Sequence, residues 1–314
     1  SHSFIGEGKA LEVKMLAEAT GSTMVIFDNE LSPGNIRALE EIIGLPVLDR
    51  SALILDIFAQ RAKTKEGRLQ VELAQYKYLL PRLSGMGTSL SRQGGGIGTR
   101  GPGETKLESD RRHIRERINR LQTELEQVRQ VRSVQRERRM KNSVPVVAIV
   151  GYTNAGKSTL LNRLTGAGIP ANNRLFDTLD TTSRQLKVSD NLDVILSDTV
   201  GFISKLPHHL VDAFRATLEE LEYADVLLHV IDSADPNRGD HIAVVDKLIS
   251  SLAKPGTPVI YCYNKADLVS REEIPVGENV IAVSAAKGVN MQELLKLIET
   301  TLGHARHHVV LRLP

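Results

Sequence analysis

The feature that most constrains the fold is an eight-residue loop, Gly151–Ser158, with the pattern G-x4-G-K-S. It follows an apolar run that predicts a strand (146–150) and opens a segment that predicts a helix (157–164). The glycines let backbone N–H groups point at phosphate oxygens, and the helix N-terminus adds a favourable dipole. This context predicts a phosphate-binding loop in an α/β fold rather than a chance glycine-rich turn.

Apolar strands alternate with amphipathic helices from residue 144 onward. This alternation predicts a mostly parallel sheet with helices on both faces. The expected strands are 146–150, 193–197, 226–231, 259–263 and 280–283. The expected helices are 157–164, 209–222, 239–252 and 291–302.

Three further motifs follow the loop in the order that a GTP-binding domain needs. Asp198-Thr199-Val200-Gly201 ends one expected strand, where the carboxylate can hold Mg²⁺ through water and the glycine N–H can meet a γ-phosphate. Asn264-Lys265-Ala266-Asp267 ends another, and its carboxylate can accept from both donors on the guanine edge, which adenine lacks. Ser284-Ala285-Ala286 is expected on the O6 side of the base. Together the motifs predict a guanine nucleotide and its hydrolysis.

The expected nucleotide site combines these motifs with the segment Phe176–Asp180. Its members are Gly151, Tyr152, Thr153, Asn154, Ala155, Gly156, Lys157, Ser158, Phe176, Asp177, Thr178, Leu179, Asp180, Asp198, Thr199, Val200, Gly201, Asn264, Lys265, Ala266, Asp267, Ser284, Ala285 and Ala286. A threonine of the first switch must reach Mg²⁺ and sense the γ-phosphate, and Thr178 is the expected one, with Thr181 and Thr182 as alternatives. Lys157, Thr178 and Gly201 are expected to act in hydrolysis, and Ser158 and Thr178 to ligate Mg²⁺.

Two positions in the motifs bear on how fast hydrolysis runs. Phe202 stands where many small GTPases have a Gln that orients the attacking water, and a phenyl ring cannot form that hydrogen bond. Intrinsic hydrolysis is therefore expected to be slow unless a partner, an ion or a backbone group takes over. Asn154 occupies the position at which K⁺-activated GTPases commonly carry Asn, so K⁺ is a candidate cofactor. The alternative is that Asn154 only shapes the loop.

The charge of the chain is concentrated in its middle. Residues 61–142 carry 20 Lys/Arg and 9 Asp/Glu, net +11, whereas residues 1–60 are net −5 and residues 143–314 net −4. The chain as a whole is only +2. A basic segment of this size favours a polyanion through counterion release, and the alternative is a solvated helix face. Because aromatic residues are only 4% of the chain, backbone charge rather than base stacking would lead any RNA contact.

Heptad-like seams predict that this basic region is an antiparallel helical hairpin. The first seam is Leu69, Leu73, Tyr76, Leu80 and Leu83, and the second is Ile114, Ile118, Leu121, Leu125 and Val128. The second helix is expected to span 105–141. Between the helices, residues 84–103 contain eight glycines with Arg92 and Arg100, which suits either a plain linker or a loop that orders on RNA.

The remaining sequence predicts a small N-terminal α/β domain. Its expected helices are 7–19, 33–44 and 51–62, and its expected strands are 23–27 and 45–48. The resulting organisation is an N-terminal domain (1–62), a helical hairpin (63–143), a P-loop GTPase domain (144–303) and the start of a C-terminal region (304–314). No apolar run reaches the roughly 18 residues of a membrane span, no signal peptide is visible, and a single buried-strand cysteine, Cys262, fits a reducing cytoplasm.

The motifs together resemble the HflX family of GTPases. The nucleotide site carries GYTNAGKS at 151–158, FDTLD at 176–180, DTVGF at 198–202, NKAD at 264–267 and SAA at 284–286. More specific are the stretches GEGKA at 6–10, LDIFAQRA at 55–62, EGRLQVELAQ at 66–75 and GGIGTRGPGETKLE at 95–108. The chain departs from the family at Thr181, where Pro is commoner. The resemblance also implies further sequence before GEGKA and a further small domain after LRLP.

The resemblance implies a function for the basic hairpin. The family binds the large ribosomal subunit and splits 70S ribosomes, with the hairpin loop near the peptidyl-transferase centre and hydrolysis stimulated by the ribosome. The residues expected to touch 23S rRNA are Arg92, Arg100, Lys106, Arg111 and Arg112. The expected protein is a cytoplasmic monomer that uses GTP/GDP and Mg²⁺. The alternatives are a ribosome-assembly or tRNA-modification GTPase, and an RNA-binding scaffold with a nucleotide-sensing module.

Overall fold

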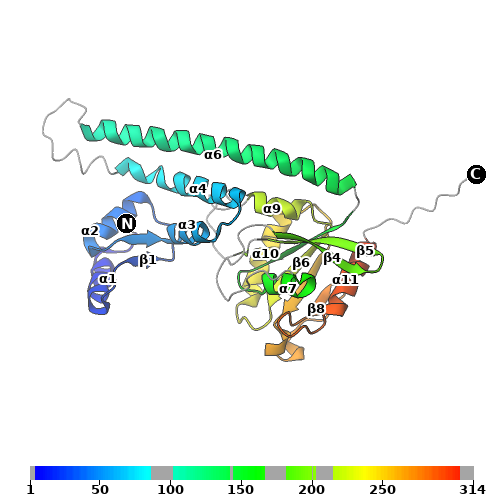
Figure 1. Ribbon diagram of the computed structural model, residues 1–314. Coiled ribbons are helices and arrows are strands. Elements are labelled where there is room, and N and C mark those ends of the chain that lie inside the picture. The colour runs from blue at the N-terminus through cyan, green and yellow to red at the C-terminus, as the bar shows by residue number, and fades with distance from the viewer. Residues whose placement is uncertain are drawn as a thin grey trace, which may run out of the picture. The chain divides into compact units, whose positions relative to one another are not determined.

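The computed structural model describes residues 4–85, 102–141, 144–166, 182–199, 201–202 and 215–304 (Figure 1). These residues form two compact units, which divide within one long helix between residues 130 and 131. Within these ranges, no helix is both long and apolar enough to cross a membrane.

The first unit begins with a small α/β layer. Its elements are α1 (Glu7–Thr20), β1 (Val25–Phe27), α2 (Pro33–Ile43), β2 (Val47–Asp49) and α3 (Arg50–Arg61). β1 and β2 pair in parallel, and the helices bury an apolar cluster around Leu39 and Val47. Ser32 and Asn35 form a capping box at the start of α2, and Gly44 ends that helix with a left-handed φ of 80°. Each of the predicted elements is present here, and the strands are shorter than expected.

The predicted hairpin follows, and its residues up to 130 lie in the same unit. It consists of α4 (Lys65–Leu79), a short 3₁₀ helix η1 (Arg82–Gly85) and the 40-residue α6 (Pro102–Lys141). The two seams pack against each other with Leu69, Leu73, Ile118, Leu121 and Leu125 as the buried residues. Figure 1 shows α4 lying along α6, and Arg117 of α6 pairs with Glu72 of α4 at 2.7 Å.

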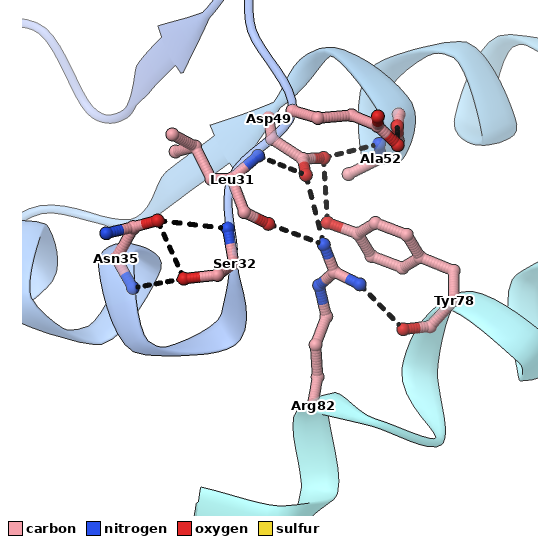
Figure 2. A network of polar contacts seen from close by, with 9 residues as sticks. Leu31, Ser32, Asn35, Asp49, Ala52, Tyr78 and Arg82 are labelled. Atoms are coloured by element: carbon pink, nitrogen blue, oxygen red, sulfur yellow. Dashed lines mark hydrogen bonds and ion pairs between the residues drawn. The ribbon is translucent and has the colours of Figure 1, made fainter. Parts of the chain in front are cut away.

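A buried polar network joins the α/β layer to the hairpin (Figure 2). Asp49 is fully buried at the end of β2, where it caps α3 by accepting from the Ala52 N–H at 2.8 Å. The same carboxylate accepts from the Leu31 N–H at 3.2 Å. The hairpin side supplies the Tyr78 hydroxyl at 2.7 Å and the Arg82 guanidinium at 3.0 Å. One carboxylate thus receives donors from four parts of the unit.

The second unit is built on a six-stranded sheet. Its strands and helices are β3 (Val146–Gly151), α7 (Lys157–Thr165), β4 (Thr182–Ser189), β5 (Leu192–Asp198), α9 (Arg215–Glu222), β6 (Val226–Asp232), α10 (Arg238–Leu252), β7 (Val259–Asn264), η2 (Ala266–Leu268), η3 (Arg271–Glu273), β8 (Val280–Ala282) and α11 (Met291–His304). The strand order is β4-β5-β3-β6-β7-β8, and every neighbouring pair is parallel except β4 and β5. Apolar residues of α7 and α11 pack on one face of the sheet, and Ile242 of α10 packs with Ile231 and Tyr263 of β6 and β7 in a separate cluster. The predicted fold class, a P-loop α/β domain with a mostly parallel sheet, is confirmed.

The antiparallel edge strand β4 was not among the expected strands. Its sequence alternates between the two faces, with Leu186 and Val188 buried and Gln185 and Lys187 exposed. Two apolar residues are a weak period-two signal, because an edge strand presents one face to solvent. The expected helix 209–222 is described only from Arg215 onward.

Candidate functional site

The phosphate loop connects the end of β3 to the start of α7. Gly151 has a φ of 153°, and a Cβ there would lie 2.3 Å from the Val230 carbonyl oxygen. Gly156 has a φ of 93°, and its Cβ would lie 2.2 Å from Asn264 Nδ2. Both positions therefore require glycine, for conformation and for space. Asn154 adopts a left-handed φ of 64° and is exposed, a conformation that Asn tolerates better than most residues.

Lys157 lies inside this loop and is only 6% exposed. Its Nζ donates to the carbonyl oxygens of Gly151 at 3.1 Å and Tyr152 at 2.9 Å. Burial lowers the pKa of Lys157 to about 8, and the nearby charge of Asp198 opposes that shift. The ammonium is therefore held in a place where a bound anion would stabilise it.

We expect nucleotide binding to take up protons above pH 8. The free protein loses the Lys157 proton near pH 8, whereas a bound phosphate chain favours the charged ammonium and raises its pKa. GDP affinity should be flat well below pH 8 and should fall by up to about tenfold per pH unit above it. Calorimetry at pH 8.5, in two buffers of different ionisation enthalpy, counts the protons. The matched control is pH 6.5, where uptake by Lys157 should vanish; equal uptake at both values would contradict the expectation.

Two oxygen-bearing side chains that could bind a metal ion, Ser158 and Asp198, lie next to the loop, at the start of α7. Ser158 Oγ donates to Asp198 Oδ2 at 3.2 Å, and Asp198 is fully buried at the end of β5. The neighbouring Thr199 hydroxyl donates to the Ile149 carbonyl at 2.6 Å, which fixes the turn after the strand. A hydroxyl beside a carboxylate is a donor set that suits a hard cation such as Mg²⁺. The other expected residues Phe176, Asp177, Thr178, Leu179, Asp180 and Val200 lie outside the described residues.

The residues after Val200 lie against the phosphate loop. Tyr152 and Phe202 form a parallel bridge, in which the Thr153 N–H donates to the Phe202 carbonyl at 2.7 Å. Gly201 lies beside Lys157, since a Cβ on it would be 3.1 Å from the Lys157 Nζ. The Phe202 side chain is only 3% exposed. It is therefore a packed residue, and the expectation of slow intrinsic hydrolysis stays a prediction.

Asn264 connects the phosphate loop to the loop expected to contact the base. Its Nδ2 donates to the Ala155 carbonyl at 2.9 Å, and its Oδ1 accepts from the Ala285 N–H at 3.0 Å. Its side chain is buried, so both bonds are shielded from water. This single side-chain amide therefore fixes the phosphate loop and the S-A-A motif relative to each other.

The carboxylate expected to recognise guanine is Asp267. A hydrogen bond from Ser284 and then one from Lys287 hold its pKa below the usual value, so it is charged at neutral pH. Lys287 Nζ lies 3.1 Å from Asp267 Oδ2. A carboxylate has about four acceptor positions, so two remain for the paired donors of a guanine edge. Lys265, which has a left-handed φ of 61°, directs its Nζ to Asp232 at 2.6 Å.

Several residues that support this site were not among the expected ones. They are Arg163, Asp232, His241 and Lys287. His241 of α10 stacks on the Tyr152 ring with centroids 3.6 Å apart. Lys287 directly follows the S-A-A motif, which was a usable signal; the other three had none, because their partners are distant in sequence.

The candidate RNA-contacting residues are described only in part. Arg92 and Arg100 lie outside the described residues, and Lys106 lies in α6 without a described side chain. Arg111 and Arg112 are on α6, and Arg112 is exposed.

Comparison with known proteins identifies the family. The family described as 50S ribosome-binding GTPase matches residues 146–265, and the GTP-binding GTPase N-terminal and middle-region families match 1–59 and 61–139. The chain is 56% identical to the GTPase HflX of Caldanaerobacter subterraneus subsp. tengcongensis, over 95% of this chain and 70% of that protein. It is 47% identical to the GTPase HflX of Escherichia coli K12, over 99% and 74%. A solved GTP-binding protein from Sulfolobus solfataricus in complex with GDP is 27% identical, with a TM-score of 0.53 over 97% of this chain and 88% of that one. The chain is therefore a GTP-binding, GTP-hydrolysing member of the HflX GTPase family.

Proposed function

We propose that this GTPase binds the large ribosomal subunit in its GTP state and separates 70S ribosomes. The main support for the proposal is that one chain joins a GTPase domain to a helical hairpin. The apolar seams of the two hairpin helices pack against each other. Arginines on the other side of α6 are exposed within the described residues, so they can contact a partner. The family matched by the nucleotide domain is described as 50S ribosome-binding, which favours the ribosome over other RNAs.

The α6 helix separates its apolar and basic sides. Ile118 and Leu121 are buried against α4, whereas Arg112, Arg115 and Arg120 are exposed. Arginines on an exposed helix face can contact successive phosphates and release counterions. Together with Arg92, Arg100, Lys106 and Arg111, they would form the contact with 23S rRNA.

In the nucleotide site, we assign roles according to what each side chain can reach. Lys157 would neutralise the β- and γ-phosphates, and the Gly201 N–H beside it would meet the γ-phosphate. Ser158 and Thr178 would hold Mg²⁺ directly and Asp198 through water; the ion supplies charge neutralisation between the phosphates. Asp267 would accept from guanine, and Asn154 is the candidate residue for K⁺.

Hydrolysis and ribosome binding would be coupled in both directions. GTP would order the switch segments and favour the subunit-bound state. The bound subunit would in turn supply the group that orients the attacking water, because the Phe202 ring cannot form that hydrogen bond. The protein would act as a monomer in the cytoplasm. GTP turnover measured with and without purified large subunits tests this coupling. Sedimentation of 70S ribosomes with a non-hydrolysable GTP analogue tests separation. Equal turnover with and without subunits would exclude the proposal, and stimulation by tRNA or immature subunits instead would favour an assembly or modification role.

Substitution of Arg112 and Arg115 by Gln should weaken subunit binding without affecting GTP affinity. Each phosphate contact that is lost should reduce the slope of log K against log salt by about one. We expect the double variant to bind about tenfold more weakly at physiological salt, with a slope reduced by about two. The matched control is Arg271→Gln, an exposed arginine in the nucleotide-binding unit, which should change neither quantity. Wild-type affinity and salt slope in the double variant would remove α6 from the proposed interface.

A further inference from the structure

An arginine of the helix that follows the phosphate loop donates two hydrogen bonds to the Ser284-Ala285-Ala286 loop, which is expected to contact the guanine base. Arg163 of α7 donates its Nε to the Ala285 carbonyl at 2.9 Å and an Nη to the Ala286 carbonyl at 2.5 Å. The guanidinium is a rigid planar fork, so it holds two successive carbonyls in a fixed orientation. This contact spans more than 120 residues of sequence and lies wholly within the nucleotide-binding unit.

Because the peptide bond is planar, the contact between Arg163 and the Ala285 carbonyl also fixes the direction of the Ala286 N–H. The Ala285 C=O and the Ala286 N–H belong to one trans peptide plane and point in opposite directions. Because the carbonyl points at Arg163, the Ala286 N–H points away from it. The Ala285 N–H already donates to Asn264 Oδ1 at 3.0 Å. The Ala286 N–H has no acceptor within the part of the chain that the structure describes, so it is available to a ligand.

The rest of this loop is closed on itself. The Ser284 carbonyl accepts from the N–H groups of Gly288 at 2.7 Å and Val289 at 3.0 Å, and the Ser284 hydroxyl accepts from the Lys287 N–H at 3.2 Å. These bonds fix the two ends of the loop but leave the 285–286 peptide to be oriented from outside. Arg163 supplies that orientation. The amino side of guanine has separate support, because Lys287 and Ser284 hold Asp267.

We propose that Arg163 is a positioning residue for guanine recognition, which aims the Ala286 N–H at O6 of the base. Arg163 does not contact the base itself. It orients the 284–286 loop, and in this way it links the phosphate-binding helix to the loop that recognises guanine. The inference rests on the assignment of GTP to this site. It predicts that the loss of Arg163 weakens recognition of O6 while recognition of the 2-amino group is kept.

Affinities for three diphosphates separate these two sides of the base. 6-Thio-GDP replaces O6 by a poor acceptor, and IDP keeps O6 but lacks the 2-amino group. In the wild type, both should bind more weakly than GDP. In Arg163→Ala, we expect GDP affinity to fall about tenfold and the preference for GDP over 6-thio-GDP to shrink by about the same factor. The preference for GDP over IDP should be unchanged. Displacement of a fluorescent GDP analogue measures all three dissociation constants.

Three further variants make the result specific. Arg163→Lys keeps the charge without the fork, so it should lose most of the O6 preference. Lys287→Met should show the reverse pattern, with a smaller preference over IDP. Arg184→Ala, an exposed arginine on β4, should match the wild type. Full retention of the O6 preference in a folded Arg163→Ala protein would overturn the proposal, as would an equal loss of both preferences. A wild type that does not distinguish the three diphosphates would instead refute the assignment of the site, and with it the inference.

Discussion

Gly156→Ala is expected to abolish nucleotide binding at ordinary concentrations. The new Cβ would lie 2.2 Å from Asn264 Nδ2, and the residue would have to hold a φ of 93°. The left-handed backbone alone costs roughly 1–3 kcal/mol for a residue other than glycine. Asn264 must also move, and it would release the Ala155 carbonyl and the Ala285 N–H together. Phosphate and base recognition should fail at once, and GDP affinity should fall by about a thousandfold.

A second glycine of the same unit provides the matched control. Gly166, at the end of α7, has a φ of 67°, and a Cβ there would meet no atom of the described residues within 4 Å. Gly166→Ala should therefore carry a similar backbone cost without moving Asn264. Titration with a fluorescent GDP analogue should show near wild-type affinity for Gly166→Ala and no saturable binding for Gly156→Ala. Comparable affinity in the two variants would show that the contact with Asn264 is not needed.

The elements with local chemical signals could be predicted from the sequence. The start of α2 was visible in Ser32 and Pro33, and its end in Gly44, because caps depend on neighbouring residues only. The hairpin followed from two seams whose partners lie on consecutive helices. The sequence predicts the long helix at 105–141, and the helix begins at Pro102, a residue that suits the first helical turn. The edge strand β4 could not be predicted, because its two buried residues, Leu186 and Val188, are too few to establish the two-residue alternation of a strand.

The same distinction separates the predicted and missed parts of the site. Each motif acts through its own backbone, so Gly156 and Asp198 could be placed by pattern alone. Arg163 could not, because its partners at 285 and 286 are brought to it only by the order of the sheet and by the packing of α7. Asp232 meets Lys265 because β6 and β7 are neighbours and pair residue 232 with residue 264. Contacts of this kind depend on strand order and register, which local sequence does not encode.

Asp49→Ala is expected to destabilise the first unit severely while leaving the nucleotide site intact. The substitution removes the cap of α3 and leaves the Leu31 N–H, the Tyr78 hydroxyl and the Arg82 guanidinium without their shared acceptor (Figure 2). Breaking a buried pair by removing one partner costs about 3–5 kcal/mol, and a lost cap costs about 1 kcal/mol. Against a typical stability of about 5–15 kcal/mol, this is a large fraction. Hydrogen exchange should show faster opening across α2, α3 and α4, with unchanged exchange in β3 and β6.

Removing both charges should cost less than removing Asp49 alone. Arg82 is largely buried and also donates to the carbonyl oxygens of Tyr78 and Leu31, while its guanidinium lies 3.3 Å from the centre of the Tyr78 ring. In Asp49→Ala this cation stays in a desolvated place without its counter-charge, so much of the destabilisation comes from Arg82 itself. The double variant Asp49→Ala/Arg82→Met removes that cation and keeps an apolar stem over the ring. Exchange protection of α3 should therefore recover in part in the double variant. Additive effects of the two substitutions would show that Asp49 and Arg82 do not stabilise the unit as a pair, and that their ion pair contributes nothing of its own to holding the α/β layer on the hairpin.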